Sequence, residues 1–278
     1  MKRCGFVAVL GETNAGKSTL VNQLVGQKVS IVSRKVQTTL NRILGIAIHE
    51  DSQIILIDTP GFAFHGHDIE SLHKIAWDAF REAPEVLFVV DACKKNFEKS
   101  VEILKKIHAD KKVSLILNKV DLIHKPKLLE IAAMFNQVRS LENIFMVSAL
   151  TDSGVGDVKK YLAKIVPEGD WIFAEDEITD LSFETFTAEI TREHVYHRVH
   201  QEIPYKSKVI TTHCENDENG KGVSVYQDIV VESPAHKKIL LGQGGGKIKA
   251  IGEASRMELM KLFDQKIHLF LNVVVKKQ

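Results

Sequence analysis

The sequence has few cysteines and no long apolar run, and each absence excludes a class of protein. Among its 278 residues only Cys4, Cys93 and Cys214 are cysteines, and no two of them are close in sequence. This spacing excludes a disulfide framework and a zinc ribbon, and it fits a reducing compartment. The longest wholly apolar runs have about five residues, whereas a membrane-spanning helix needs roughly 20. Because no signal-peptide pattern opens the chain, we expect a cytoplasmic protein.

The chain also lacks a large net charge, but its charges are distributed unevenly. The formal net charge is +1. Between Glu168 and Glu184 there are seven acidic residues and no lysine or arginine. From Ala235 to Gln278, nine lysines and arginines stand against three acidic residues, a surplus of six positive charges. This basic C-terminal region indicates a polyanionic partner, and nucleic acid is the first candidate.

Up to residue 167, short apolar runs alternate with helical patterns. The apolar runs are FVAVL (6–10), GIAI (45–48), IILI (54–57), VLFVV (86–90), LIL (115–117) and IFMV (144–147). Continuous apolar strands separated by helices are typical of a mostly parallel sheet that is covered on both faces. Residues 1–167 are therefore predicted to form an α/β domain with a doubly wound, mostly parallel sheet.

The rest of the chain has a different pattern. After Pro167 the acidic residues 168–182 are predicted to form a solvated linker. Residues 183–278 then give a helix, two strands, two helices with glycines between them, and a last strand. The predicted second domain is α+β with the order α-β-β-α-α-β.

A phosphate-binding loop is predicted at residues 11–18, where GETNAGKS matches the pattern G-x-x-x-x-G-K-[ST]. The motif lies between a strand pattern and a helix pattern, which is the context that this loop requires. The glycines let main-chain amides converge on phosphate oxygens, and the helix directs its positive end there. Lys17 is expected to bridge the β- and γ-phosphates, and the Ser18 hydroxyl to bind Mg²⁺.

Three further motifs indicate which nucleotide base the site recognises. Asp58-Thr59-Pro60-Gly61 follows the strand IILI, and there Asp58 is expected near Mg²⁺ and the Gly61 amide near the γ-phosphate. Asn118-Lys119-Val120-Asp121 follows LIL, and a carboxylate at 121 can accept both N1–H and the N2 amine of guanine, donors that adenine lacks. Ser148-Ala149-Leu150 follows IFMV and is expected to offer an amide to guanine O6. Together they predict a GTP site.

These motifs resemble those of the Era-like family of translation-factor-related bacterial GTPases. The segment VSRKVQTTLNRILGI (32–46) is similar to the switch I region of that family. The resemblance implies that Thr39 contacts Mg²⁺ and the γ-phosphate, with Thr38 as the alternative. Leu40 departs from the family, where arginine is usual at this position.

The resemblance also implies a slow GTPase. Phe62 follows the D-x-x-G motif, and phenylalanine cannot orient the attacking water as glutamine does in Ras-like enzymes. Asn14 matches an asparagine that binds K⁺ in some relatives. The residues expected to act in hydrolysis are Lys17, Thr39, Gly61 and Asn14. Those expected to bind Mg²⁺ are Ser18, Thr39 and Asp58. Those expected to bind the nucleotide are Gly11, Asn14, Ala15, Gly16, Lys17, Ser18, Thr19, Asp58, Gly61, Asn118, Lys119, Asp121, Ser148, Ala149 and Leu150.

The second glycine cluster, in ILLGQGGGKIKAIG (239–252), resembles the G-x-x-G loop of a type II KH domain. A loop without bulky side chains lets a nucleic-acid backbone lie against two helix ends. Ile239, Leu241, Ile248 and Ile251 are expected to line a base-binding groove. The residues expected to bind RNA are Lys237, Lys238, Ile239, Leu241, Gly242, Gln243, Gly244, Gly245, Lys247, Ile248 and Lys249. Gly244 departs from the family, which often has lysine there. The alternative is a helix–helix turn that binds no ligand.

The resemblance, which covers nearly the whole chain, implies a monomeric switch that binds the 3′ end of small-subunit (16S) rRNA and acts in 30S assembly under the control of GTP. Two alternatives stay open. One is a non-enzymatic RNA chaperone that uses GTP as a structural ligand. The other is a signalling GTPase whose basic C-terminal face contacts the inner face of the cell membrane.

Overall fold

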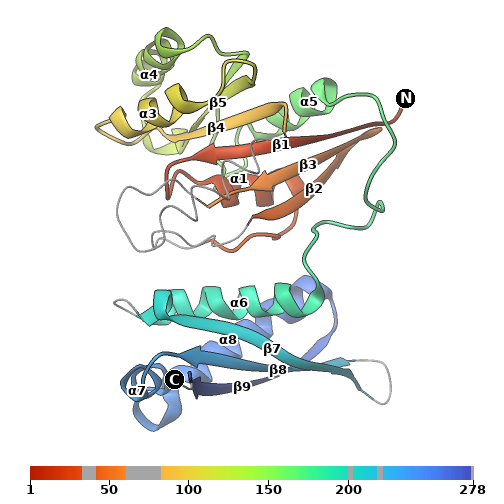
Figure 1. Cartoon of the computed structure of the whole chain (residues 1–278), viewed down its shortest axis with the longest axis vertical. Helices are drawn as coiled ribbons and strands as arrows, with labels where there is room; N and C mark the ends of the chain where they lie inside the picture. Colours follow the sequence, from red (N-terminus) through yellow and green to blue (C-terminus); the bar gives the residue numbers. More distant parts are fainter. Residues whose placement is uncertain (33–41, 61–82, 200–202, 218–221, 277–278) are drawn as a thin grey trace. The chain divides into compact units, whose positions relative to one another are not determined.

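The computed structural model describes residues 1–32, 42–60, 83–199, 203–217 and 222–276 (Figure 1). The chain forms two compact units, Met1–Asp180 and Leu181–Gln278. Each unit has its own sheet, with six strands in the first and three in the second. The two units are therefore described separately.

The sheet of the first unit has the strand order β2-β3-β1-β4-β5-β6. Its strands are β1 (Arg3–Gly11), β2 (Ile43–His49), β3 (Ser52–Asp58), β4 (Glu85–Asp91), β5 (Lys112–Asn118) and β6 (Asn143–Met146). β1 runs parallel to β3 and β4, and β4, β5 and β6 continue in parallel. Among the described strands of this sheet only β2 is antiparallel, because a tight turn with Glu50 at φ 52° reverses the chain into β3. The prediction of a mostly parallel sheet is confirmed.

Helices cover both faces of this sheet. α1 (Lys17–Val25) and α5 (Val155–Ile165) pack on one apolar cluster, and α3 (Glu98–Lys106) and α4 (Lys125–Val138) pack on the other. A short 3₁₀ helix, η1 (Val120–Leu122), follows β5. The side chains of β1 alternate between the two clusters, with Val7 and Val9 on the α1 side and Ala8 and Leu10 on the α3 side. Burial on both faces explains why the strands are continuous apolar runs.

The acidic segment differs from the solvated linker that the sequence predicts. Residues 171–180, which we call the strap, run along β2 and β3. The Ile46 amide donates to the Ile178 carbonyl at 2.9 Å, and the Leu44 amide donates to Asp180 Oδ1 at 3.0 Å. The buried side chain of Gln53, in β3, accepts from two strap amides at 2.9 and 3.0 Å and donates to a strap carbonyl at 2.9 Å. The first two bonds satisfy amides at the free edge of β2, and those of Gln53 satisfy the strap, so the strap is part of the first unit.

The second unit has the predicted order α-β-β-α-α-β. Its elements are α6 (Phe183–Arg198), η2 (Ile203–Lys206), β7 (Ser207–Asn216), β8 (Gly222–Val231), α7 (Pro234–Leu241), η3 (Gln243–Gly245), α8 (Gly246–Phe263) and β9 (Lys266–Val275). β8 is the central strand, antiparallel to β7 and parallel to β9. Val195, Leu240 and Ile251, one from each helix, pack on Ile229 and Val273 of the sheet. The α+β prediction is confirmed.

Candidate functional site

The loop between β1 and α1 has the form that the phosphate-binding motif predicts. Gly16 is the N-cap of α1 with φ 94°, and a Cβ there would collide with the side-chain amide of Asn118. Lys17, Ser18 and Thr19 form the first turn of α1. The unpaired amides and the positive dipole end of a first helical turn attract anions. The residues from Gly11 to Thr19 are therefore arranged as a phosphate cradle.

The ammonium group of Lys17 is buried inside this loop. Its Nζ donates to the main-chain oxygens of Glu12 at 3.0 Å and of Gly11 at 3.3 Å. Burial lowers the pKa of Lys17 to about 8, although the carboxylates of Asp58 and Glu12 favour the charged form. A charged phosphate oxygen would be a stronger hydrogen-bond acceptor for the Lys17 ammonium group than these two main-chain carbonyls.

Asp58 ends β3 and suits a Mg²⁺ site together with Ser18. Its side chain is fully buried, and burial raises its pKa. Within the described residues neither carboxylate oxygen makes a hydrogen bond of good geometry, yet the hydroxyls of Ser18 and Ser30 lie near enough to favour the ionised form. A divalent cation would satisfy this buried carboxylate. Oxygen ligands beside a phosphate cradle are the donor set that Mg²⁺ prefers.

Asn118 connects the phosphate cradle to the base-recognition segments. Its Nδ2 donates to the Ala15 carbonyl at 2.9 Å, which ties β5 to the loop after β1. Its Oδ1 accepts from the amides of Lys119 at 2.8 Å and Ala149 at 3.0 Å. Asp121 lies exposed in η1, so its carboxylate is accessible to a guanine base. The structure thus brings together three segments that are far apart in the sequence.

The turn after β6 is held in a defined shape. The Ser148 amide donates to the Ser153 carbonyl at 2.9 Å, and the Ser148 hydroxyl accepts from the Thr151 amide at 3.3 Å. Ala149 is buried against Asn118, whereas the Leu150 side chain is 79% exposed. The three residues lie at the carboxyl edge of the sheet, where ligands of open α/β sheets bind.

Five residues named from the sequence lie outside the described part of the chain. They are Thr38, Thr39, Leu40, Gly61 and Phe62. Their roles in the switch segments and in hydrolysis therefore stay predictions.

Sequence reasoning missed a set of charged contacts behind the cradle. The Glu12 carboxylate accepts from Lys94 Nζ at 2.5 Å and from the Ser100 hydroxyl. Lys119 Nζ lies 2.6 Å from Asp91 Oδ2. These pairs join positions separated by 28 to 88 residues, so no local pattern shows them. The available signal was weak: Asp91 ends an apolar strand, as a nucleotide-site residue often does.

The second glycine cluster forms a loop between α7 and α8. Gly242 ends α7 with φ 73°, and a Cβ on it would lie 2.8 Å from the Lys247 Cβ, so the two helix ends approach closely. Gly244 has φ 58° and open space around it, so a lysine there would fit but would require left-handed backbone. The predicted loop of small residues between two helix ends is present.

A groove lies beside this loop, between α8 and β9. Its apolar lining comes from Ile248 and Gly252 of α8 and from Leu269 and Leu271 of β9. Lys249 and Arg256 add positive charge, while Glu253 is acidic. The full lining is Ile248, Lys249, Gly252, Glu253, Arg256, Leu269 and Leu271. The wall from β9 was missed, because only the fold places that edge strand next to α8.

Of the four apolar residues expected to line the groove, Ile248 does so, whereas Ile239, Leu241 and Ile251 do not. Ile251 is fully buried and packs in the core of the second unit, because it faces the sheet. Ile239 is 41% exposed. Leu241 and Ile248 are both partly buried and both pack against the core, but Ile248 also lines the groove. The four expected lysines are exposed or partly exposed at the two helix ends: Lys237, Lys238, Lys247 and Lys249.

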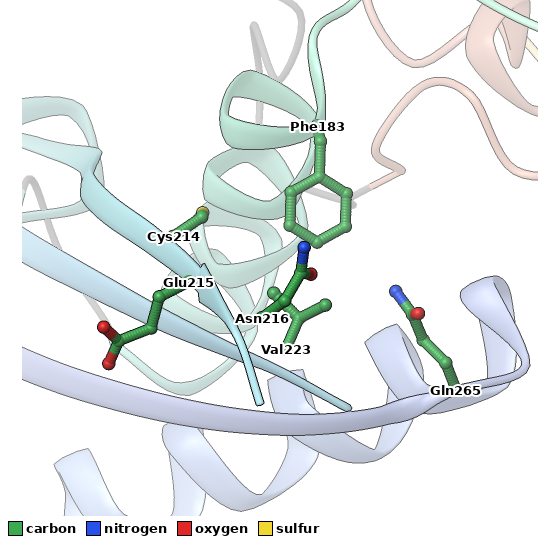
Figure 2. Close-up of a pocket in the computed structure, with 6 residues that line it drawn as sticks. All are labelled: Phe183, Cys214, Glu215, Asn216, Val223 and Gln265. Atoms are coloured by element: carbon green, nitrogen blue, oxygen red, sulfur yellow. The ribbon is translucent and has the colours of Figure 1, made fainter. Parts of the chain in front are cut away.

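Figure 2 shows a different hollow, at the far end of α8 from the glycine loop. It is lined by Phe183, Cys214, Glu215, Asn216, Val223 and Gln265. Burial and the nearby Glu184 raise the pKa of the Cys214 thiol. Among the described residues, the lining of this hollow contains Glu215 and no lysine or arginine, so it lacks the positive charge of the groove beside the glycine loop.

The described ranges contain neither a cluster of metal-ligating side chains nor a helix that could span a membrane. No cluster of three or more His, Cys, Asp or Glu side chains there has the arrangement of a metal site. No described helix is both long enough and apolar enough to span a bilayer.

Two family models match the chain. Residues 6–119 match the model described as 50S ribosome-binding GTPase, and residues 202–278 match the KH domain model. The first match covers the cradle and the segment up to Lys119, and the second covers the glycine loop and the groove.

Several known proteins are similar to this chain over almost its whole length. GTPase Era of Rhizobium meliloti (strain 1021) is 47% identical over 99% of this chain and 88% of its own length. GTPase Era of Brucella suis biovar 1 (strain 1330) is 45% identical, with 99% and 89% covered. A crystal structure of Aquifex aeolicus Era Y63A bound to GDP·AlF4⁻ superimposes with a TM-score of 0.92 at 32% identity, covering 99% of this chain and 95% of that one. Era in complex with MgGDPNP and nucleotides 1506–1542 of 16S ribosomal RNA gives the same TM-score and identity, with 100% and 95% covered.

Proposed function

The chain belongs to the Era family of GTPases, and we propose that it is a GTP-controlled switch that binds the 3′ end of small-subunit rRNA during 30S assembly. The observation that carries the proposal is the presence, in one chain, of a complete phosphate cradle with its guanine-recognition segments and of a basic groove beside a G-x-x-G loop. The solved complex of Era with MgGDPNP and 16S rRNA nucleotides supports the proposal that the RNA partner is small-subunit rRNA.

In the nucleotide site, the chain's own residues bind and orient GTP. The amides of the first turn of α1 and the Lys17 ammonium hold the phosphates. Ser18 and Asp58 would hold Mg²⁺, and the ion, when bound, would supply positive charge that neutralises the phosphates. Asp121 accepts two hydrogen bonds from guanine, and the Asn118 amide keeps its segment next to the cradle. These residues would hold the γ-phosphate in position for attack by water.

Hydrolysis is proposed to be slow until a further positive charge completes the site. Phe62 offers no group that orients water, and Thr39 and Gly61 are proposed to close on the γ-phosphate as the switch contacts. Asn14 stands in the cradle with φ 62° and is the proposed ligand of a K⁺ ion near the phosphates. Single-turnover hydrolysis should be faster in K⁺ than in Na⁺, and equal rates would remove the potassium ion from the proposal.

In the second unit, the groove is proposed to hold single-stranded bases while the glycine loop contacts the backbone. A loop without side chains allows close approach of phosphates, and the nearby lysines neutralise them. Ile248, Leu269 and Leu271 provide an apolar surface for bases. GTP binding is proposed to order the switch segments and so to change RNA affinity.

Cross-linking of RNA to the full-length protein in cells tests this function. Small-subunit rRNA should be recovered at residues 242–249, and substitution of Gly242 and Gly245 by aspartate should abolish the cross-link. Recovery of other RNA classes only, or of none, would contradict the proposal.

Two rival functions have their own tests. If Lys17→Ala released phosphate from GTP as fast as the wild type, the protein would be an RNA chaperone with GTP as a structural ligand.

A cytoplasmic location is part of our proposal, since the rRNA partner is there. If the protein floated with anionic vesicles and not with ribosomal subunits, the basic C-terminal region would instead be a membrane-contact surface.

A further inference from the structure

The side chain of Glu12, the second residue of the phosphate-binding loop, is not part of the phosphate cradle. Only 7% of Glu12 is exposed. Its Oε2 accepts from Lys94 Nζ at 2.5 Å, and its Oε1 accepts from the Ser100 hydroxyl. Ser100 is itself 2% exposed and lies in α3. The loop after β1 is thus anchored to α3 by a buried, charged contact.

The main chain of Glu12 takes part in the cradle itself. Its carbonyl oxygen accepts from Lys17 Nζ at 3.0 Å and from the Ala15 amide at 3.3 Å. One residue therefore connects the phosphate-binding lysine, the first turn of the loop and α3. A shift of its side chain moves the carbonyl to which Lys17 is bonded.

Lys94 lies in the loop after β4, and hydrogen bonds and an ion pair fix that loop. Its amide donates to the Asp91 carbonyl at 3.2 Å. The Asp91 carboxylate in turn lies 2.6 Å from Lys119 Nζ and accepts from the Cys93 amide at 3.0 Å. The loop after β4 thus contacts both the phosphate-binding loop and the base-recognition segment.

A carboxylate buried beside a polyphosphate site is unfavourable unless a cation neutralises it. Like charges repel strongly where water is excluded, and a buried charge that loses its partner destabilises its surroundings. Lys94, whose side chain is 30% exposed, is the cation in direct contact with the Glu12 carboxylate. Its removal would leave Glu12 buried, charged and close to the incoming phosphates.

We propose that Glu12, Lys94 and Ser100 form a positioning cluster for the nucleotide: Glu12 anchors the phosphate-binding loop to α3, and Lys94 prevents the Glu12 carboxylate from repelling the phosphates. The inference rests on the proposed nucleotide site. The residues act through the loop, so none of them is a catalytic residue.

The test is a set of dissociation constants for GDP and for a non-hydrolysable GTP analogue, measured on the full chain with Mg²⁺. Lys94→Met, which removes the charge and its hydrogen bond but keeps a chain of similar length, should weaken the binding of both ligands by about tenfold or more, and of the triphosphate more than of the diphosphate. Glu12→Gln should change them by less than about threefold, because a neutral amide still bonds Ser100. The double variant, Glu12→Gln with Lys94→Met, should return to within about threefold of the wild type, since no unpaired charge remains.

Two controls separate charge from folding. Lys95→Met removes a neighbouring exposed lysine and should leave both dissociation constants unchanged. Lys94→Arg keeps the charge and should keep wild-type affinity, even if Lys94→Met lowers the melting temperature.

Three outcomes contradict the cluster. They are an unchanged affinity in Lys94→Met, a double variant as weak as Lys94→Met, and a loss in Lys94→Arg equal to that in Lys94→Met. Failure of the wild-type chain to bind either nucleotide would instead overturn the proposed nucleotide site, and the inference with it.

Discussion

At the residue scale, Asn118 shows how a single side chain joins parts of the site. Its amide bonds the loop after β1, its own motif and the turn after β6. The sequence predicts contact with the nucleotide, and in the structure the same side chain also holds three segments together. We propose that base recognition depends on the exposed Asp121 in the next turn.

Asp121→Asn should move the base preference from guanine to xanthine. The carboxylate accepts two donors of guanine, whereas an amide offers one donor and one acceptor, which matches the xanthine edge. Competition binding with GTP and xanthosine triphosphate measures the change. Unchanged GTP affinity in the variant would place the base elsewhere.

The buried Lys17 predicts a pH dependence of nucleotide binding. Its pKa in the free protein is lowered to about 8, and bound phosphates raise it again. Below that pH, Lys17 is protonated with and without nucleotide, so it contributes no pH dependence. Above pH 8, nucleotide binding takes up a proton, and the affinity for GDP should fall by up to about tenfold per pH unit.

Titration calorimetry between about pH 7 and pH 9, in two buffers of different ionisation enthalpy, measures that proton uptake. The same affinity and no proton uptake across this range would contradict the lowered pKa.

At the scale of elements, the strap shows how a polar side chain fixes a segment that looks like a linker. Gln53 is fully buried in β3, and it bonds the Ile172 amide at 2.9 Å and the amide and carbonyl of Phe173 at 3.0 and 2.9 Å. Trp171 Nε1 also donates to the Asp51 carbonyl at 3.0 Å. The acidic composition of the segment indicates solvation, but its main-chain groups are satisfied by the first unit.

Gln53→Leu should lower the free energy of unfolding of the first unit by about 3 kcal/mol, because it leaves strap amides and a carbonyl without partners. Urea unfolding followed by circular dichroism measures the loss. Gln137→Leu, on the exposed face of α4, is the matched control and should change stability by less than about 0.5 kcal/mol. Equal stability of the two variants would mean that the strap is not anchored by Gln53.

Much of the fold follows from local patterns, and the rest does not. Five of the six apolar runs lie wholly in strands, because strands buried on both faces need apolar residues at every position. The sixth run, IFMV (144–147), extends one residue beyond β6, an edge strand that is only partly buried. The antiparallel direction of β2 could not be predicted, since it depends on a turn whose Glu50 adopts a conformation that usually favours glycine.

Some features of the candidate site could likewise be predicted from local patterns, and others could not. The phosphate-binding loop and the NKVD motif are predictable, because their residue types and spacing are set by the ligand. Glu12 with Lys94, Gln53 with the strap, and Leu271 beside α8 depend on contacts between distant segments. Ile251 was misassigned, because a helical pattern does not say which of two neighbouring faces meets the sheet.

At the scale of the whole molecule, one chain carries a nucleotide site and a basic, apolar-lined groove, and membership of the Era family joins the two. A switch of this kind requires that GTP and RNA affect each other's affinity. Thermodynamic linkage makes the effect reciprocal, and coupling between two sites typically changes affinity by about 5- to 150-fold.

The most direct measurement of this coupling is the affinity of the full chain for a fragment of the 3′ end of small-subunit rRNA, with a Mg²⁺-bound GTP analogue or with GDP in the nucleotide site. We predict binding that is at least about tenfold tighter in one nucleotide state than in the other. Equal affinities in the two states, or no binding of this RNA in either, would contradict the account.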